Sequence, residues 1–584
     1  MNDTLNEITF VRGEMRLWSD YTGTPGPARG PVLHALLSDV LRPARRTLVA
    51  GPHEAALVDL VASRSETVRV LVRSVEDATA LASDVAAGNV SVLAGSLDGL
   101  DDTGFDAVVA LDGLDRLLGT DGADLDWSGR LSALLGAAAP DAQVLLGLEN
   151  EFSMTAVLDR RLPADQHGDE DWVPLHEDPS RPSSPAAFGD ALAAAGFPAA
   201  LVYAGFNAGA EPLVLAGTAA AADTRPGRLA ARLAVGALEA DPTPLLAPAR
   251  DAVHRAARAG LLGAVAHGWV AVREPGSELY AKTSASSALA GARDEAGGWW
   301  SVATRGEPAV SGGAVVAGPE LRNVPDTETV ETVLLRLAVA EDVPGFRALA
   351  ARLGEWVRRQ GGAELAVWDD TVLSAESFVS GPVVWVTSSP ADSAVLLAAA
   401  WHRFHDRLVR TRGRHPWPPW MVGQDLVSAW VAMSGAEADA RTLARGRELA
   451  DAVAAATGAA LGGAATDETA TGAEADLRTA LHDAEALRQQ IVELTGRIGA
   501  LERLAGFRDQ QLRTRENLIR TLREDLQKAI AARRGAENRL AKIKRSRTYK
   551  VANTMRRVAL IRKPRRIAAG LKRRLRSRVK SRRT

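Results

Sequence analysis

Residues 46–150 repeat one pattern, in which a short apolar segment is followed by a stretch with helical periodicity. The apolar segments read TLVAG, VRVLV, VSVLAG, FDAVVAL and AQVLLGL. They are apolar at consecutive positions, as parallel strands are when helices cover both faces of their sheet. Strands that alternate with helices need right-handed crossovers, so the pattern predicts an α/β fold with a doubly wound sheet.

Ligands of such sheets bind at the carboxyl ends of the strands, where the strand order reverses. The predicted strands end near Gly51, Arg73, Gly95, Asp112 and Glu149. We therefore expect any site in this part of the chain to lie among these residues.

The run FDAVVALDGLDRLL, the helix after it and the strand AQVLLGLEN resemble the second half of a class I S-adenosylmethionine-dependent methyltransferase. The helix expected at 186–196 and the strands ALVYAG and EPLVLAG are similar to the helix and β-hairpin that close that fold. The resemblance covers residues 13–220. It implies a Rossmann-like methyltransferase domain at residues 1–222, with S-adenosylmethionine as cofactor.

By this resemblance the cofactor contacts are Gly51, Arg73, Ser96 and Leu111. The family's first loop is rich in glycine because backbone amides approach the methionine carboxylate closely. Here the loop reads VAGPHEA and keeps only Gly51. Arg73 and Ser96 stand where the family has carboxylates after its second and third strands. Two interpretations stay open: a methyltransferase fold with a weakened or lost site, and an active enzyme with unusual contacts.

The resemblance extends to proteins of bacterial surface-glycan assembly. An active enzyme of this kind would transfer a methyl group to an oxygen of a sugar or surface polysaccharide. Asp112 and Glu149, at the ends of the fourth and fifth strands, are then the candidate bases or substrate-orienting groups. The alternative is a non-catalytic oligomeric scaffold for glycan-assembly enzymes at the membrane surface.

Residues 223–440 are rich in tryptophan and are predicted to form an α+β auxiliary domain. The segment AVWDDTVL is similar to the metal-binding lobe of small-molecule kinases, with Asp369 and Asp370 at its first carboxylate position. Trp385 lies where the second carboxylate belongs, so the sequence predicts no phosphoryl transfer. The chain has no cysteine, and His402 and His405 lack a third ligand, so no metal site is predicted.

Residues 441–472 are predicted to be the end of a helix and a flexible linker, and residues 473–543 a coiled coil. In a single heptad register from Ala473 to Ile543, positions a and d are apolar except at Arg508, Arg515 and Arg533. A seam of this length predicts a homo-oligomer, and we favour a parallel dimer.

Residues 544–584 are predicted to be a basic tail. The segment from Lys542 to Thr584 holds 19 Lys and Arg and no acid, whereas the preceding chain has a net charge of −21. Val551, Met555 and Val558 share one helical face, and a second stripe runs from 567 to 579. These features predict binding to an anionic membrane surface.

Nucleic acid is the less favoured partner of the tail, because Tyr549 is its only aromatic residue. The stretch SRTYKVA is similar to the ends of some surface-glycan glycosyltransferases, which implies a glycan or glycosyltransferase partner. The polar start of the chain and the lack of a long apolar run predict a cytoplasmic protein that is peripheral at the inner face of the membrane.

Overall fold

A computed structural model describes residues 8–22, 25–161, 178–241, 243, 245–305, 309–311, 314–317, 320–360, 365–375, 377–387, 392–411, 415–418, 421, 423–461 and 477–561. The chain forms two compact units, Met1–Thr469 and Ala470–Thr584.

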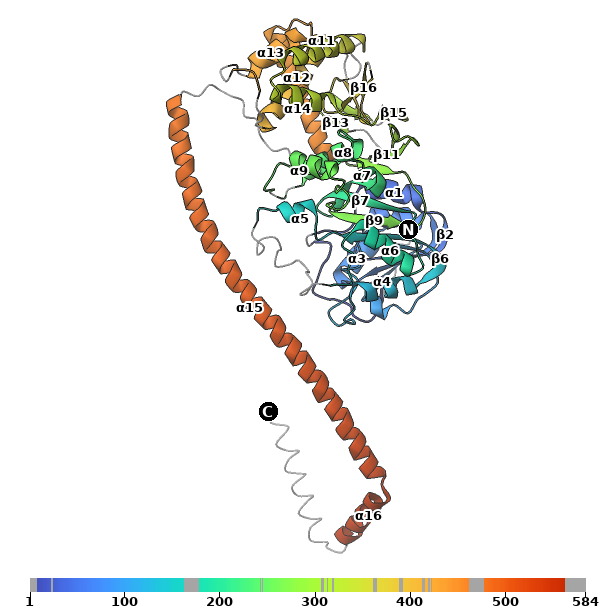
Figure 1. The fold of residues 1–584 in the computed structure, drawn as a ribbon. Helices are drawn as coiled ribbons and strands as arrows, with labels where there is room; N and C mark the ends of the chain where they lie inside the picture. The colour runs from blue at the N-terminus through green and yellow to red at the C-terminus, as the bar shows by residue number, and fades with distance from the viewer. Residues whose placement is uncertain are drawn as a thin grey trace, which may run out of the picture. The chain divides into compact units, whose positions relative to one another are not determined.

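The first unit is built on one large sheet, which contains 13 strands among the described residues (Figure 1). From edge to edge they are β1 (Ile8–Phe10), β4 (Val90–Ala94), β3 (Ser65–Val72), β2 (Ala44–Ala50), β5 (Phe105–Ala110), β6 (Ala138–Glu149), β9 (Gly268–Val272), β7 (Leu201–Ala208), β8 (Glu211–Gly217), β10 (Leu279–Lys282), β11 (Ala288–Arg293), β12 (Trp299–Arg305) and β15 (Arg322–Pro325). The first six are parallel, and the strands from β9 onward pair antiparallel with their neighbours. The predicted α/β sheet is confirmed, with the five predicted strands as β2 to β6.

Helices cover both faces of the parallel part of the sheet. One core contains α1 (Pro31–Val40), α2 (Ala55–Ala62) and α3 (Val75–Asp84), and the core on the opposite face contains α4 (Trp127–Gly136) and α6 (Pro185–Ala194). Successive residues of each strand alternate between these cores: Val49 belongs to the first, and Leu48 and Ala50 to the second. This two-sided burial is the reason that the strands are apolar throughout.

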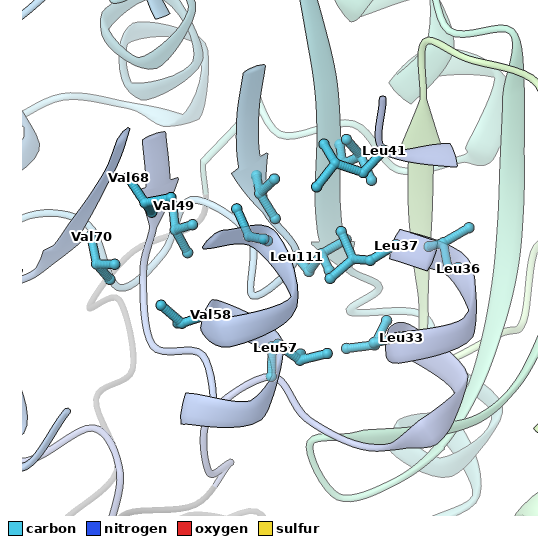
Figure 2. Packing of buried hydrophobic residues seen from close by; sticks show 14 of the residues in the cluster. Leu33, Leu36, Leu37, Leu41, Val49, Leu57, Val58, Val68, Val70 and Leu111 are labelled. Atoms are coloured by element: carbon cyan, nitrogen blue, oxygen red, sulfur yellow. The ribbon is translucent and has the colours of Figure 1, made fainter. Parts of the chain in front are cut away.

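Figure 2 shows the first of these cores, where leucines of α1 lie beside α2 and the strands. The side chains labelled there are Leu33, Leu36, Leu37, Leu41, Val49, Leu57, Val58, Val68, Val70 and Leu111. All are buried. At about 25 cal/mol per Å² of apolar surface, such packing is the main favourable contribution to folding.

The predicted closing hairpin is only part of the arrangement after β6. β7 and β8 pair with one another as expected, but β9 lies between β6 and β7 and pairs antiparallel with both. The sheet then continues from β8 into β10, β11, β12 and β15. It therefore passes through the predicted domain boundary at residue 222, and β9, β10, β11, β12 and β15 extend the sheet of the first predicted domain.

The remaining elements of the first unit surround two further cores. Against the extended sheet lie α5 (Met154–Leu158), α7 (Thr218–Ala221), α8 (Leu229–Ala240) and α9 (Ala249–Arg258). A helical bundle consists of α10 (Val330–Val339), α11 (Val343–Arg359), α12 (Ser393–Thr411), α13 (Gly423–Met433) and α14 (Ala440–Leu461). Beside it are two small sheets, β13 (Ala309–Ser311) with β14 (Ala314–Ala317) and β18 (Val384–Thr387), and β16 (Thr371–Ser374) with β17 (Ser377–Ser380).

Tryptophans dominate the core of the bundle. Trp368, Trp401 and Trp430 are almost fully buried, and Phe346 lies between 5.8 and 6.0 Å from the rings of the last two. Aromatic pairs at such distances stabilise a core beyond the area that they bury. The tryptophan-rich composition of this region is therefore explained by packing.

The second unit consists of α15 (Leu477–Arg545) and α16 (Arg547–Ile561) (Figure 1). The 69 residues of α15 form one continuous helix, as the heptads predict, and its association with a second copy stays a prediction. The second apolar stripe of the tail, at residues 567–579, lies outside the described residues. Within the described part of the chain, no helix has both the length and the apolar character needed to cross a membrane.

Candidate functional site

The strand order reverses between β2 and β5, so a ligand of this sheet is expected in the crevice outside their carboxyl ends. Gly51 follows β2 and Leu111 follows β5, while Arg73 follows β3 and Ser96 lies just after β4. All four predicted cofactor contacts thus lie along one edge of the sheet. Side chains of the protein itself lie at these strand ends.

The imidazole of His53 bridges the carboxyl ends of β2 and β5 at the reversal point. Its Nδ1 lies 3.0 Å from the carbonyl oxygen of Gly51, and its Nε2 accepts the backbone N–H of Leu111 at 3.1 Å. Because Nε2 accepts, the proton is on Nδ1 and is donated to Gly51. The residue is only 1% exposed, and this burial lowers the pKa of His53, which keeps the ring neutral.

The described residues from 8 to 30, which we call the N-terminal strap, cross the carboxyl ends of three strands. β1 of the strap pairs with β4, and Met15 forms a bridge with Ser74 at the end of β3. Ala28 then pairs with the first loop: its N–H donates to the oxygen of Pro52 at 3.0 Å, and its own oxygen accepts the N–H of Glu54 at 3.0 Å. The backbone of the strap therefore lies over the edge where the family places its cofactor.

A buried ion pair joins the strap to the end of β3. Nε and Nη2 of Arg73 donate to the two carboxylate oxygens of Asp20 at 2.8 and 2.6 Å, and Nη1 donates to the oxygen of Leu118 at 3.2 Å. The exposed fractions of the Arg73 and Asp20 side chains are 0% and 4%. Arg73 thus neutralises a carboxylate of its own chain at the position where the family binds ribose hydroxyls with an acid.

Ser96 is covered by the strap. The residue is fully buried, its N–H donates to the oxygen of Arg12 at 3.1 Å, and its hydroxyl accepts the N–H of Gly119 at 3.2 Å. Gly13 has φ +92° and passes so close that an added Cβ would lie 2.5 Å from Cβ of Ser96. Only glycine allows this approach of strap to strand end.

Asp112, one of the two predicted catalytic residues, forms an ion pair with Arg116 four residues later. Nε of Arg116 donates to the Asp112 carboxylate at 2.9 Å. The same guanidinium donates to the backbone oxygens of Asp20, Pro25 and Gly26 at 3.0, 2.7 and 2.8 Å. Asp112 therefore holds the side chain that fastens the strap, which leaves it poorly placed to act as a base.

Glu149, the other predicted catalytic residue, has an exposed side chain at the end of β6. Neighbouring atoms nevertheless desolvate its carboxyl and raise the pKa of Glu149; the charge of Arg181 opposes this rise, and the charges of Asp115 and Asp112 add to it. Arg181 lies next to it: its guanidinium donates to the Glu149 backbone oxygen at 3.0 Å and to Asp115 at 2.6 Å. Glu149 is thus a solvent-accessible carboxyl with a raised pKa at the ligand edge.

These residues do not fit S-adenosylmethionine. His53 lies between the ends of β2 and β5 and accepts the N–H of Leu111, so that this amide is not open to a ligand. At the ribose position, Arg73 donates to both carboxylate oxygens of Asp20, so that neither charge is left for a ligand. Sequence reasoning identified Arg73 and the altered loop as departures from the family, but it missed Asp20 and Arg116. The four-residue spacing of Asp112 and Arg116 was the one available signal.

In the helical bundle, the two kinase-like carboxylates have separate partners. Arg403 donates to Asp369 at 2.9 Å, while the backbone N–H of Val383 donates to Asp370 at 3.2 Å. Desolvation raises the pKa of Asp370 to about 8. No cluster of three or more His, Asp or Glu side chains suitable for a metal ion occurs among the residues that the structure describes.

A cavity of about 330 Å³ lies between the start of α8, β15 and the end of β16. Arg228 lines it and is 6% exposed, with its guanidinium directed to Asp326 and Asp223. The other charged residues of its wall include Arg225, paired with Asp223, and Glu328, paired with Arg336. Because these charges are already paired within the chain, the cavity does not identify a ligand.

Comparisons with known proteins give structural neighbours only. No protein-family model matches the chain. No curated protein matches it either.

The similar solved structures include methyltransferases. A protein of Bacillus halodurans C-125 assigned to the methyltransferases is 10% identical, with a TM-score of 0.18; the match covers 20% of this chain and 51% of that one. The N-methyltransferase NodS of Bradyrhizobium japonicum WM9, in complex with S-adenosyl-L-homocysteine, is 16% identical, with coverages of 20% and 59% and a TM-score of 0.17.

A Haloferax volcanii protein assigned to the methyltransferases, in complex with the activator Trm112, is 17% identical, with coverages of 42% and 88% and a TM-score of 0.25. The chain spans about half the length of the first of these structures.

Proposed function

We propose that this protein is a non-catalytic, methyltransferase-like scaffold that assembles as an oligomer. The observation that carries the proposal is the occupied ligand edge, where His53 bridges the ends of β2 and β5 and the Asp20–Arg73 pair seals the end of β3. Methyl transfer needs that edge open to S-adenosylmethionine. The methyltransferase-like sheet would then serve as a stable platform for partners.

The cost of opening this edge supports the proposal. Separating a buried ion pair by removing one partner typically costs about 3–5 kcal/mol, because a charge is left without compensation. A cofactor that displaced the strap would have to offset a similar amount. Every 1.4 kcal/mol is a factor of ten in affinity, so binding would weaken by roughly a hundredfold to several thousandfold.

The helix α15 supports the oligomeric part of the proposal. Ile498 and Ile519 at position a, and Leu501 and Leu522 at position d, are between 49% and 64% exposed. Isoleucine at a with leucine at d favours parallel two-stranded coiled coils. Two copies would cover these side chains and bring two methyltransferase-like units together, which gives a scaffold its valency.

Calorimetric titration of the full chain with S-adenosylmethionine and with S-adenosyl-L-homocysteine tests the proposal. We expect no saturable binding of either ligand up to millimolar concentration. Saturable heat with a dissociation constant in the low micromolar range would contradict it. ATP, which shares the adenosine group, is the control for nonspecific binding of nucleosides.

Methylation of a sugar or polysaccharide oxygen is the second candidate function, and the position of Glu149 favours it. An exposed carboxyl with a raised pKa at the ligand edge is a suitable general base. Transfer of labelled methyl groups to a panel of sugars would reveal this activity, and Glu149→Gln should abolish it. If no acceptor is methylated and no cofactor binds, the scaffold function is the one supported.

A further inference from the structure

The helices α15 and α16 are separated at Ser546. The N–H of Ser546 donates to the oxygen of Lys542 at 3.0 Å, which completes the last turn of α15. Its hydroxyl accepts the N–H of Tyr549 at 3.2 Å, which is the bond of a serine N-cap. Residues 547–561 are therefore a separately capped helix, α16.

One face of α16 is apolar and open to solvent. Val551, Met555 and Val558 are 56%, 69% and 53% exposed. Their spacing of four and three residues puts them on one side of a helix. Such a stripe needs a partner that can cover apolar groups.

The apolar face of α16 is out of register with the coiled coil. Continued from α15, the heptad puts Arg547 and Thr554 at position a and Lys550 and Arg557 at position d. The apolar residues fall at positions e and b instead. A second copy of the chain that pairs along the α15 seam would therefore meet charges in α16 and leave its apolar face uncovered.

Positive charge accompanies this face. Arg547 lies beside it on the helical wheel, and Lys550, Arg556 and Arg557 lie further round, towards the opposite side of the helix. The chain has no acid after Glu537. Long basic side chains beside an apolar stripe can keep their charges at lipid headgroups while the stripe enters the acyl boundary.

We propose that α16 lies on an anionic lipid surface, with its apolar face in the headgroup boundary and its arginines on lipid phosphates. This inference goes beyond the scaffold function and does not depend on the ligand edge. Nucleic acid would use the charges alone, and α16 offers only Tyr549 for base stacking. Each basic residue near such a surface adds roughly fivefold to affinity, and two chains joined by α15 add a second anchor.

The test is co-sedimentation of the full chain with phosphatidylcholine vesicles, with and without 30% phosphatidylserine, at about 0.1 M salt. We expect binding to the anionic vesicles only. The triple variant Val551→Ser, Met555→Ser, Val558→Ser should weaken it at least tenfold. The control variant Phe507→Ser, Leu518→Ser removes apolar groups of α15 that are 60% and 57% exposed, and it should bind like the wild type.

Three outcomes would overturn the proposal. In the first, the triple variant binds vesicles as the wild type does, which would show that the apolar face is not used. In the second, the control variant is weakened equally, so that the effect is not specific to α16. In the third, the wild type does not bind anionic vesicles while it holds duplex DNA tightly, which would identify a nucleic-acid arm.

Discussion

Removal of the Arg73 guanidinium should release the N-terminal strap. Arg73→Ala deletes the 2.8 and 2.6 Å bonds to Asp20 and leaves a carboxylate that is 4% exposed. The remaining bond shown for this carboxylate is the 2.8 Å bond from Nε1 of Trp18. A buried pair broken on one side typically costs about 3–5 kcal/mol. We expect that cost to appear mainly as opening of the strap, because the cores of the sheet are formed by other residues.

Hydrogen exchange of the full chain measures this opening locally. Amides of residues 51, 53–55 and 111–116 should lose roughly a hundredfold to several thousandfold of their protection, which is the same free energy at 1.4 kcal/mol per factor of ten. The double variant Asp20→Ala, Arg73→Ala should recover part of the loss, because it leaves no uncompensated charge.

The matched control for this experiment lies on the same strap. Arg12 is paired with Asp98 at 2.8 Å, but its side chain is 71% exposed. Exposed pairs are typically worth less than about 1 kcal/mol, so Arg12→Ala should change protection by less than about fivefold. Equal protection in Arg73→Ala and Arg12→Ala would refute the claim that the buried pair holds the strap closed.

Three further predictions concern other parts of the chain. Burial lowers the pKa of His53, so the folded state resists protonation, and the free energy of unfolding should fall as pH drops below about 6.5. His53→Gln should reduce this fall, as measured by urea unfolding between pH 5 and 7.5. The pKa of Asp370 is raised to about 8, so its effect on the free energy of unfolding has the opposite sign: stability should decline as pH rises from about 4 towards 8. Asp370→Asn should remove that decline. Ile519→Ser, at position a, should lower the mass measured by light scattering towards that of a monomer, whereas Leu518→Ser, next to it and outside the seam, should not.

The parallel half of the fold could be predicted from the sequence because its strands are buried on both faces. This condition forces runs such as Leu48, Val49 and Ala50 to be apolar at every position. The insertion of β9 between β6 and β7 could not be predicted in the same way. Its sequence, GWVAV, has no local feature that predicts which strands it pairs with, because β9 pairs with β6 and β7, which are distant in the chain.

The predicted linker shows another limit of pattern reading. Its sequence begins AAATGAAL, and small residues without apolar periodicity predict flexibility there. The structure continues α14 to Leu461, and Ala452, Val453 and Ala456 of that helix are buried in the bundle. Alanine has the highest helix propensity, and small residues allow close packing, so a helix needs no large side chains here. Residues 462–472 of the predicted linker, and 473–476 at the start of the predicted coiled coil, lie outside the described residues.

At the ligand edge, sequence reasoning identified what is unusual but not what replaces the missing contacts. Gly51, Arg73 and Ser96 could be placed because they follow strands that the pattern locates. Asp20 comes just before the Gly- and Pro-rich segment TGTPGPARGP at residues 22–31, which has no periodicity from which its position could be predicted. Its pairing with Arg73 is a tertiary contact between residues 53 positions apart.

Because the strap covers the ligand edge, the effect of opening it on cofactor binding distinguishes a scaffold from a latent enzyme. If opening the strap costs about 3–5 kcal/mol, the open state is populated at roughly one part in a hundred to one in several thousand. A site with intrinsic micromolar affinity for S-adenosylmethionine would then appear to bind it at submillimolar to millimolar concentration. Opening by Arg73→Ala removes this penalty, so a latent site should bind the cofactor at least a hundredfold more tightly in the variant. The scaffold function predicts no gain, because His53 still bridges the ends of β2 and β5 and no acid stands at the ribose position. Calorimetry on wild type and Arg73→Ala therefore separates the two, and micromolar binding by the variant would show that the edge is a gated site.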